Sequence, residues 1–224
     1  MQKLKKYNNF TLVGKANDED DEDTPSPNPN QHLTFFQSTQ TNRCIKAAID
    51  ENVREAKYYR VLIQAIDSLG SDDLLLLSIN TYGGHLDGAI ALINAMNNTD
   101  ANVHCSIDGV AASAGSLIAL ASPSVSVSPY ASMMIHSATF GAFGKQSDVI
   151  SHASFVDKQV KSLMSDVYKD FLTDQELSDV FMGKELWFNS DEIVQRLERR
   201  QELVLARHKK EEREAKKATA KTSK

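Results

Sequence analysis

Residues 74–84 have the sequence LLLLSINTYGG, and residues 103–115 have the sequence VHCSIDGVAASAG. In each stretch an apolar run typical of a strand leads into a glycine-bearing turn, and a segment of helical character follows. The run over residues 74–79 is apolar almost throughout, as expected for a central strand that is covered on both faces. The two stretches therefore predict a repeated strand-turn-helix unit, and with it an α/β fold with a largely parallel sheet.

The same patterns predict further elements along the chain. We expect helices over residues 50–69, 86–96, 113–121 and 146–172, strands over residues 32–37, 125–127 and 133–135, and a turn over residues 109–112. The helix over residues 146–172 is polar enough to project from the core. Its apolar positions, among them Phe155 and Leu163, predict contact with another subunit.

Composition sets limits on the class of protein. The chain has 224 residues, of which 41% are hydrophobic and 25% charged, enough for one domain with a buried core. No apolar run approaches the about 20 residues of a membrane-spanning helix, and the basic N-terminus lacks the apolar stretch of a signal peptide. Cys44 and Cys105 have no metal-like spacing, so we expect a cytoplasmic protein without a metal site.

Charge divides the chain into three parts. Residues 18–23 form an unbroken acidic run followed by a proline-rich stretch, which predicts a flexible segment over residues 1–31. Residues 32–197 form the predicted domain, and residues 198–224 form a basic tail. We expect the tail to be helical near Leu203 and Leu205 and then to fray. It has no aromatic residues to stack on bases, so a solvated extension is favoured over nucleic-acid binding.

Three features of the predicted domain suggest chemistry. Ser113 begins a helix among small neighbours, where the positive end of the helix dipole favours a developing oxyanion. The pair Gly83 and Gly84 follows a strand and can present free N–H groups to a cleft. His136 ends an apolar strand. Each also has a plainer interpretation: tight helix packing, a turn that needs positive φ, and a structural histidine.

Taken together, the three features resemble one family. Residues 79–84 (INTYGG) resemble the I-N-S-P-G-G turn of the ClpP proteolytic subunits, residues 109–115 (GVAASAG) their G-x-A-A-S-x-G nucleophile motif, and residues 134–136 (MIH) their M-I-H. The resemblance runs from about residue 43 to 197. It implies a crotonase-like superhelix of strand-turn-helix units and a serine endopeptidase without cofactor.

The resemblance implies a role for each matching residue. Ser113 would be the nucleophile, His136 the general base, and the N–H groups of Gly84 and Ala114 the oxyanion hole. Substrate would bind as an added strand along Gly83 and the segment Thr139, Phe140 and Gly141.

The third triad member departs from the family pattern, which has an aspartate. Alignment places Glu185 there, and the E-x-W formed by Glu185 and Trp187 resembles the phage-type Clp-like proteases. A glutamate can orient a histidine. The alternative is that Glu185 is a surface charge and that Asp174 or Asp179 serves instead.

The resemblance also implies a homo-oligomeric ring that acts on polypeptides. Tyr82 replaces the family's proline, and residues 1–30 hold no clear counterpart of its pore loop. Two kinds of partner therefore stay open: an AAA+ unfoldase driven by ATP, or viral scaffold and capsid proteins cut during head maturation. The rival functions are a crotonase-type acyl-CoA enzyme and a non-catalytic ring subunit.

Overall fold

The computed structural model describes residues 42–139, 141 and 143–222, with side chains up to residue 215. In this part of the chain one sheet holds β1 (Cys44–Ile49), β2 (Leu74–Thr81), β3 (Asn102–Ala112), β4 (Val125–Val127), β5 (Ser132–Ile135) and β6 (Leu186–Asn189). The strand order is β1-β2-β3-β5-β6, and β4 also pairs with β3. Only β5 and β6 pair antiparallel among these described strands. The α/β prediction is confirmed.

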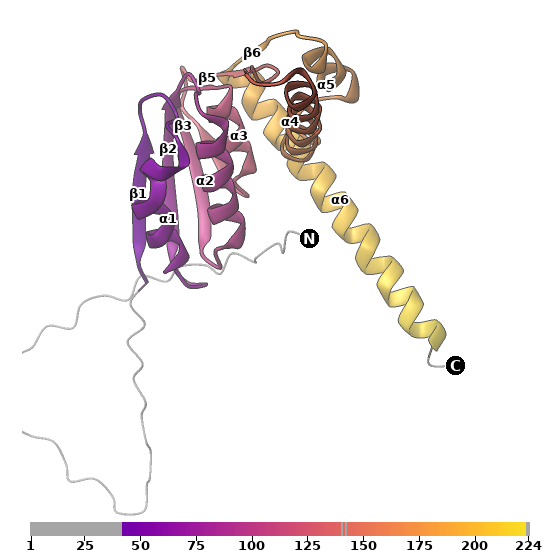
Figure 1. The fold of residues 1–224 in the computed structure, drawn as a ribbon. Helices are drawn as coiled ribbons and strands as arrows, with labels where there is room; N and C mark the ends of the chain where they lie inside the picture. Colours follow the sequence, from indigo (N-terminus) through magenta and orange to yellow (C-terminus); the bar gives the residue numbers. More distant parts are fainter. Residues whose placement is uncertain (1–41, 140, 142, 223–224) are drawn as a thin grey trace, which may run out of the picture. The chain divides into compact units, whose positions relative to one another are not determined.

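Helices follow or flank these strands (Figure 1). They are the 3₁₀ helix η1 (Ala56–Tyr59), α1 (Arg60–Asp67), α2 (Leu86–Asn98), α3 (Ala114–Ala121), α4 (Gln146–Val167), α5 (Asp174–Phe181) and α6 (Ser190–Thr222). Helices α1, α2 and α3 lie side by side in front of the sheet in Figure 1, while α6 packs against β4, β5 and β6. None of the described helices is long and apolar enough to cross a membrane.

The core lies between the sheet and these helices. The burial of β2 differs from the prediction of a strand that is covered on both faces. In β2 the alternate residues Leu75, Leu77 and Ile79 are fully buried, but Leu74 and Leu76 stay partly exposed. A run that looks apolar throughout is therefore fully covered on one face only within this chain.

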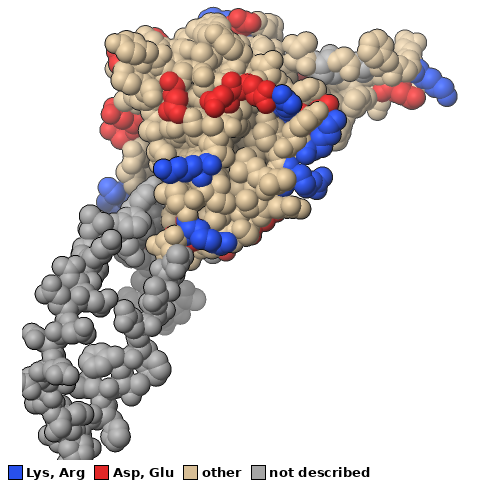
Figure 2. Space-filling model, turned by 90° about the vertical axis from the view of Figure 1, so that its left-hand side faces the viewer, with Lys and Arg blue, Asp and Glu red and all other residues tan. Residues whose placement is uncertain are grey.

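On the surface shown in Figure 2, acidic and basic side chains both appear, with uncharged surface between them.

The helix predicted over residues 50–69 begins later than expected. Residues 44–49 form β1, which the sequence did not predict, and the helical backbone starts at Ala56. Between them Val53 is extended and forms a parallel bridge to Gly84. Its N–H donates to the Gly83 carbonyl at 2.7 Å, and its carbonyl accepts from the His85 N–H at 2.8 Å. The predicted strand over 32–37 lies outside the described residues.

The turn predicted over residues 109–112 is wrong. These residues continue β3, and the pairing register with β2 shifts there, from Ile79↔Ile107 to Thr81↔Ala111. The Asn80 side chain fills the irregularity, since its Oδ1 accepts from the Val110 N–H at 3.1 Å. A Cβ on Gly109 would lie 2.4 Å from that oxygen. The glycine is there to admit a side chain from the neighbouring strand.

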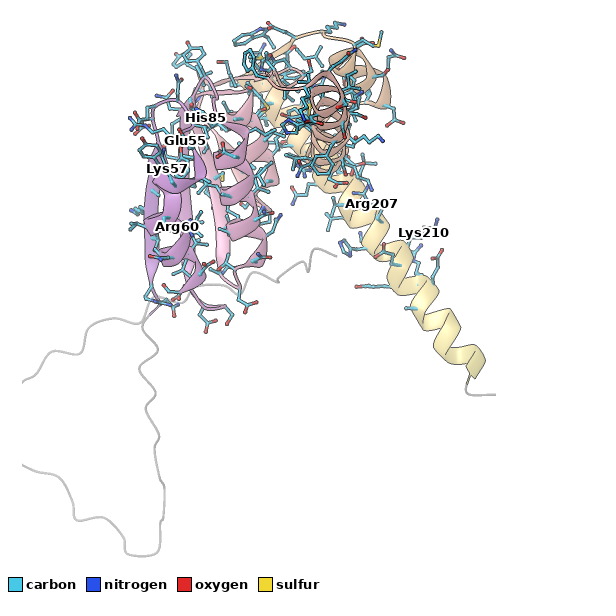
Figure 3. The ribbon with its side chains drawn as sticks, in the orientation of Figure 1. Glu55, Lys57, Arg60, His85, Arg207 and Lys210 are labelled. Carbon is cyan, nitrogen blue, oxygen red and sulfur yellow. The ribbon has the colours of Figure 1, made fainter. Side chains whose placement is uncertain are left out.

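Two predictions for the C-terminal third also need correction. Helix α4 ends at Val167 rather than at residue 172, and Asp170 then adopts a positive φ of 64°. Helix α6 does not fray after Leu205 but continues to Thr222. Its basic residues bind the folded part: Arg200 donates to the Leu120 carbonyl at 2.9 Å, and Arg207 pairs with the Asp170 carboxylate. Arg207 and Lys210 are labelled on α6 in Figure 3.

Candidate active site

Ser113 lies where β3 ends and α3 begins. It caps the N-terminus of α3 instead of lying inside the helix, with φ 53° and ψ −119°. Residues with a Cβ adopt positive φ rarely, and such strain gathers at functional sites. The Ser113 N–H donates to the Met134 carbonyl at 2.8 Å, which fixes this turn against β5. The side chain of Ser113 therefore starts from a fixed position at the end of a strand.

His136 meets Ser113 because β5 is the parallel neighbour of β3. Ala112 pairs with Met134, so the residues that follow the two strands emerge at the same edge of the sheet. His136 Nε2 lies 2.8 Å from Ser113 Oγ. If the serine donates its proton, Nε2 accepts it and the other ring nitrogen, Nδ1, carries the hydrogen. The structure thus brings together the predicted nucleophile and base.

Glu185 is the acidic residue beside His136. It directly precedes β6, which pairs antiparallel with β5 so that Leu186 lies opposite Ile135. The Glu185 Oε1 is 3.9 Å from His136 Nδ1, and the glutamate side chain is 57% exposed against 27% for the histidine. That separation exceeds a hydrogen bond. The contact is therefore an ion pair once His136 is charged, open to solvent on the carboxylate side.

The alternative acid Asp179 has other partners. Its carboxylate accepts from Gln175 Nε2 at 2.8 Å and from Lys184 Nζ at 3.2 Å. These hydrogen bonds, the one from Gln175 first, lower the pKa of Asp179 below its ordinary value. Asp174 lies in the first turn of α5. Among the described residues, the distances thus favour Glu185 over both aspartates as the neighbour of His136.

The glycine pair lies directly against the Ser113 turn. Gly83 and Gly84 have φ values of 105° and 144°, which side chains rarely adopt. A Cβ on Gly83 would lie 2.6 Å from the Ser113 Cβ. The bridge to Val53 uses the Gly83 carbonyl and the His85 N–H, so it leaves the Gly84 N–H unused. The Ala114 N–H lies in the first turn of α3, where amides have no intrahelical partner.

A groove runs past these groups. It has a volume of about 810 Å³ and is lined by Ser113, Ala114, His136 and Gly84, by an apolar wall from Leu117, Ala138, Val156, Val160 and Met164, and by a polar rim that includes Glu51, Arg54 and His85. Figure 3 labels His85 together with Glu55, which directly precedes η1, Lys57 of η1 and Arg60 of α1. Of the predicted substrate residues, Thr139 and Gly141 are exposed, and Phe140 lies outside the described residues.

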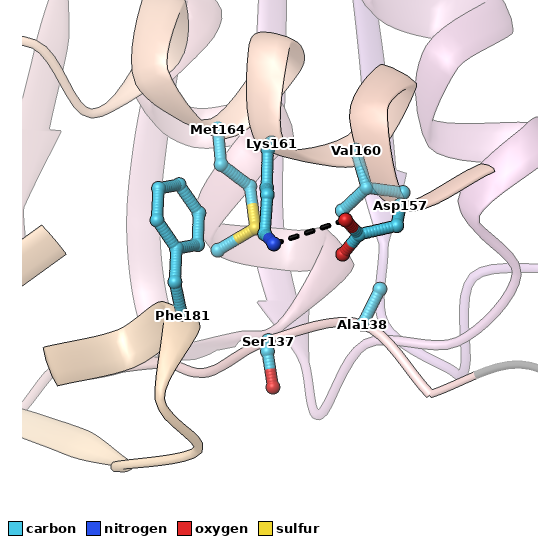
Figure 4. A pocket seen from close by; sticks show the side chains of 7 residues that line it. All are labelled: Ser137, Ala138, Asp157, Val160, Lys161, Met164 and Phe181. Atoms are coloured by element: carbon cyan, nitrogen blue, oxygen red, sulfur yellow. Dashed lines mark hydrogen bonds and ion pairs between the residues drawn. The ribbon is translucent and has the colours of Figure 1, made fainter. Parts of the chain in front are cut away.

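A second, smaller hollow lies beside the groove (Figure 4). Its volume is about 40 Å³, and it shares Ala138, Val160 and Met164 with the groove wall. Lys161 bounds it and pairs with Asp157 at 2.9 Å. A hollow of this size admits water rather than a large side chain.

Nowhere in the part of the chain described here do three His, Cys, Asp or Glu side chains gather to hold a metal ion.

Two residues that support the site were not predicted. Val53 holds the glycine pair through its bridge, and Asn80 holds the end of β3 through Val110. Asn80 lies within the quoted glycine-turn motif and could have been singled out there. Val53 gave no signal, because an isolated bridge depends on a partner far away in the sequence.

The family model for Clp protease matches residues 30–196. The chain belongs to the Clp protease family. The match covers both glycine-bearing stretches, Ser113, His136 and Glu185, and ends inside α6. Membership in the Clp protease family confirms the resemblance, and it indicates a peptidase, generally of the serine type, that acts on polypeptides and assembles into oligomers.

Proposed function

We propose that this protein is a serine endopeptidase in which Ser113 is the nucleophile and His136 the general base. The observation that carries the proposal is the 2.8 Å contact between Ser113 Oγ and His136 Nε2, at a serine that caps a helix. A nucleophile within hydrogen-bond reach of its base is the geometry that acyl transfer needs. Glu185 completes the set by orienting His136 and stabilising the imidazolium.

The chemistry follows from the positions of these groups. His136 takes the proton as Ser113 Oγ attacks the scissile carbonyl, and the same proton then goes to the leaving amine. Water attacks the acyl-enzyme in the second half of the reaction. The N–H groups of Gly84 and Ala114 would bind the oxyanion, and losing one such donor typically costs about 10²–10³ in turnover.

Substrate binding would use the groove beside the serine. We propose that a peptide lies extended between Gly83 and the segment containing Thr139, Phe140 and Gly141, and that backbone hydrogen bonds along that segment supply affinity. The Gly83 N–H and carbonyl already bond to Thr81 and Val53, so Gly83 would offer room for the peptide rather than a free donor. The apolar wall that contains Leu117 and Met164 lies next to Ser113 and supports selection for an apolar substrate side chain. Arg54 and His85 in the polar rim line the same groove.

Assembly is the second part of the proposal. Ile150 and Phe155 of α4 are 61% and 64% exposed, and large apolar side chains left in contact with solvent favour burial in a partner. Each chain would be a crotonase-like superhelix of strand-turn-helix units, and contacts through α4 would join several chains into a cytoplasmic homo-oligomeric ring that encloses the sites. An AAA+ unfoldase and viral scaffold or capsid proteins remain the two candidate partners.

A fluorophosphonate probe followed by mass spectrometry tests the proposal. We expect the probe to label Ser113, and Ser113→Ala to abolish both labelling and cleavage of short peptides. Ser151→Ala, at an exposed serine of α4, is the control and should behave as wild type. Labelling at another serine, or an active Ser113→Ala protein, would refute the assignment. A wild-type protein that assembles but is never labelled would favour the non-catalytic ring subunit.

A further inference from the structure

The backbone of Ser113 depends on its neighbours. Its φ and ψ of 53° and −119° are sparsely populated, and such conformations persist only where surrounding contacts fix them. On the far side of the residue, the Ser113 carbonyl accepts from the N–H groups of Ser116 at 3.0 Å and Leu117 at 3.3 Å. It also accepts from the Ser116 hydroxyl at 2.7 Å. Because the carbonyl and the side chain belong to the same residue, the contacts that hold the carbonyl also fix the position of Ser113 Oγ.

Two buried hydroxyl groups form a chain that ends on this carbonyl. Ser116 Oγ lies 2.8 Å from the phenolic oxygen of Tyr168. A carbonyl only accepts, so the single hydroxyl proton of Ser116 goes to Ser113, and Tyr168 donates its own proton to Ser116. The two side chains are 0% and 1% exposed. Burial raises the pKa of Tyr168, which therefore remains a donor at and above neutral pH.

Packing alone does not require either hydroxyl. Helix α3 has the sequence AGSLIALA, in which Ser116 is the one polar residue, and Tyr168 lies in the apolar core. Alanine and phenylalanine would fill nearly the same space. A helical serine often donates to a carbonyl in the preceding turn without any further partner. The buried phenol adds a second hydrogen bond that orients and polarises the serine hydroxyl.

This pair of hydroxyl groups also connects the Ser113 turn to the wall of the groove. The Tyr168 N–H donates to the Met164 carbonyl at 2.9 Å, where α4 ends. Met164 lines the groove. Tyr168 thus directly follows the helix that forms the apolar wall, while its hydroxyl reaches Ser116 and, through it, the Ser113 turn.

We infer that Tyr168 and Ser116 are positioning residues for the nucleophile: together they hold the Ser113 carbonyl, and so direct Oγ to His136 and the Ala114 N–H into the groove. This inference rests on the proposed role of Ser113 as nucleophile. Neither hydroxyl touches the substrate. Their effect is expected in turnover rather than in substrate binding.

The test uses the full-length protein with Tyr168→Phe, Ser116→Ala and both changes together. We expect Tyr168→Phe to lower kcat for a short peptide and the rate of fluorophosphonate labelling by about three- to tenfold, and KM to change by less than about twofold. Ser116→Ala should lose at least as much. The double variant should lose no more than Ser116→Ala alone, because Tyr168 acts on the Ser113 carbonyl only through Ser116.

Ser122→Ala is the matched control. Ser122 is a buried serine at the other end of α3, and its hydroxyl donates to the Ser124 carbonyl at 2.8 Å. It should lower the melting temperature without lowering kcat. Tyr168→Phe that lowers the melting temperature but keeps wild-type kcat and labelling would overturn the inference, as would losses that simply add. A wild-type protein without labelling at Ser113 would instead refute the proposed function itself.

Discussion

Glu185→Gln is the change that best tests the proposed triad. The substitution keeps the shape of the side chain and removes its charge. Glu185 Oε1 lies 3.9 Å from His136 Nδ1, and its side chain is 57% exposed. Two unit charges about 4 Å apart attract by about 1 kcal/mol in water and by about 4 kcal/mol at an effective dielectric constant of about 20. A half-exposed pair falls between these limits.

The expected loss follows from that range. Removing about 1–4 kcal/mol of imidazolium stabilisation lowers kcat by about 5-fold to about 10³-fold. Loss of the charge of a buried triad aspartate lowers kcat by about 10⁴-fold. We expect a smaller loss here, because Glu185 is exposed to solvent. Salt should shrink the difference between Glu185→Gln and wild type, since the screening length falls from about 10 Å at 0.1 M to about 3 Å at 1 M ionic strength, which is shorter than the separation of the pair.

The assay is the initial rate of short-peptide hydrolysis at low and high ionic strength, with melting curves to show that the fold is intact. Asp179→Asn is the matched control, because its carboxylate bonds to Gln175 and Lys184. It should leave kcat near wild type. If Asp179→Asn loses activity while Glu185→Gln does not, the acid has been assigned to the wrong residue. If both stay active, the site works as a Ser-His dyad.

Three further outcomes are expected. Replacing Ile150 and Phe155 with Glu should give smaller particles in light scattering, because both side chains are mostly exposed in the single chain and would be buried in the assembly. The pKa of Glu176 is held at about 2, chiefly by the hydrogen bond from an arginine of α6. Its stabilisation, at most about 3 kcal/mol, is present above its unfolded pKa of 4.5 and is lost as the pH falls toward 2. Glu176→Gln should therefore lower the melting temperature at pH 7 but not at pH 2. Gly83→Ala should prevent labelling of Ser113, whereas Gly183→Ala, with a similar φ of 99° but open space around it, should lose only stability.

The central strands could be predicted because their signal is local. The run in β2 and the alternation in β3 follow from residues next to one another in the sequence, and the crossover rule for parallel strands then brings their ends together. The meeting of Ser113 with His136 was implied by the family motifs. Its geometric cause is the pairing of β3 with β5, which no local pattern contains.

Other features could not be predicted because they depend on partners far apart in the sequence. The stretch 109–112 has the composition of a turn, yet the Asn80 side chain supplies a hydrogen bond that keeps it extended. Val53 has a helical neighbourhood, yet the bridge to Gly84 holds it extended. In each case a contact from another element outweighs a weak local propensity.

Helix α6 shows the same principle at the boundary of the domain. Its composition predicts a solvated tail, and charge alone cannot tell whether an arginine faces water or a carbonyl. Arg199 and Arg200 donate to the carbonyls of Phe171 and Leu120, and Arg207 pairs with Asp170, whose positive φ marks the turn between α4 and α5. The contacts with Phe171 and Asp170 tie α6 to the turn that follows α4, and the contact with Leu120 ties it to α3. We therefore expect a chain cut at residue 200 to be less stable than the full chain, since the cut would leave the carboxylate of Asp170 without Arg207.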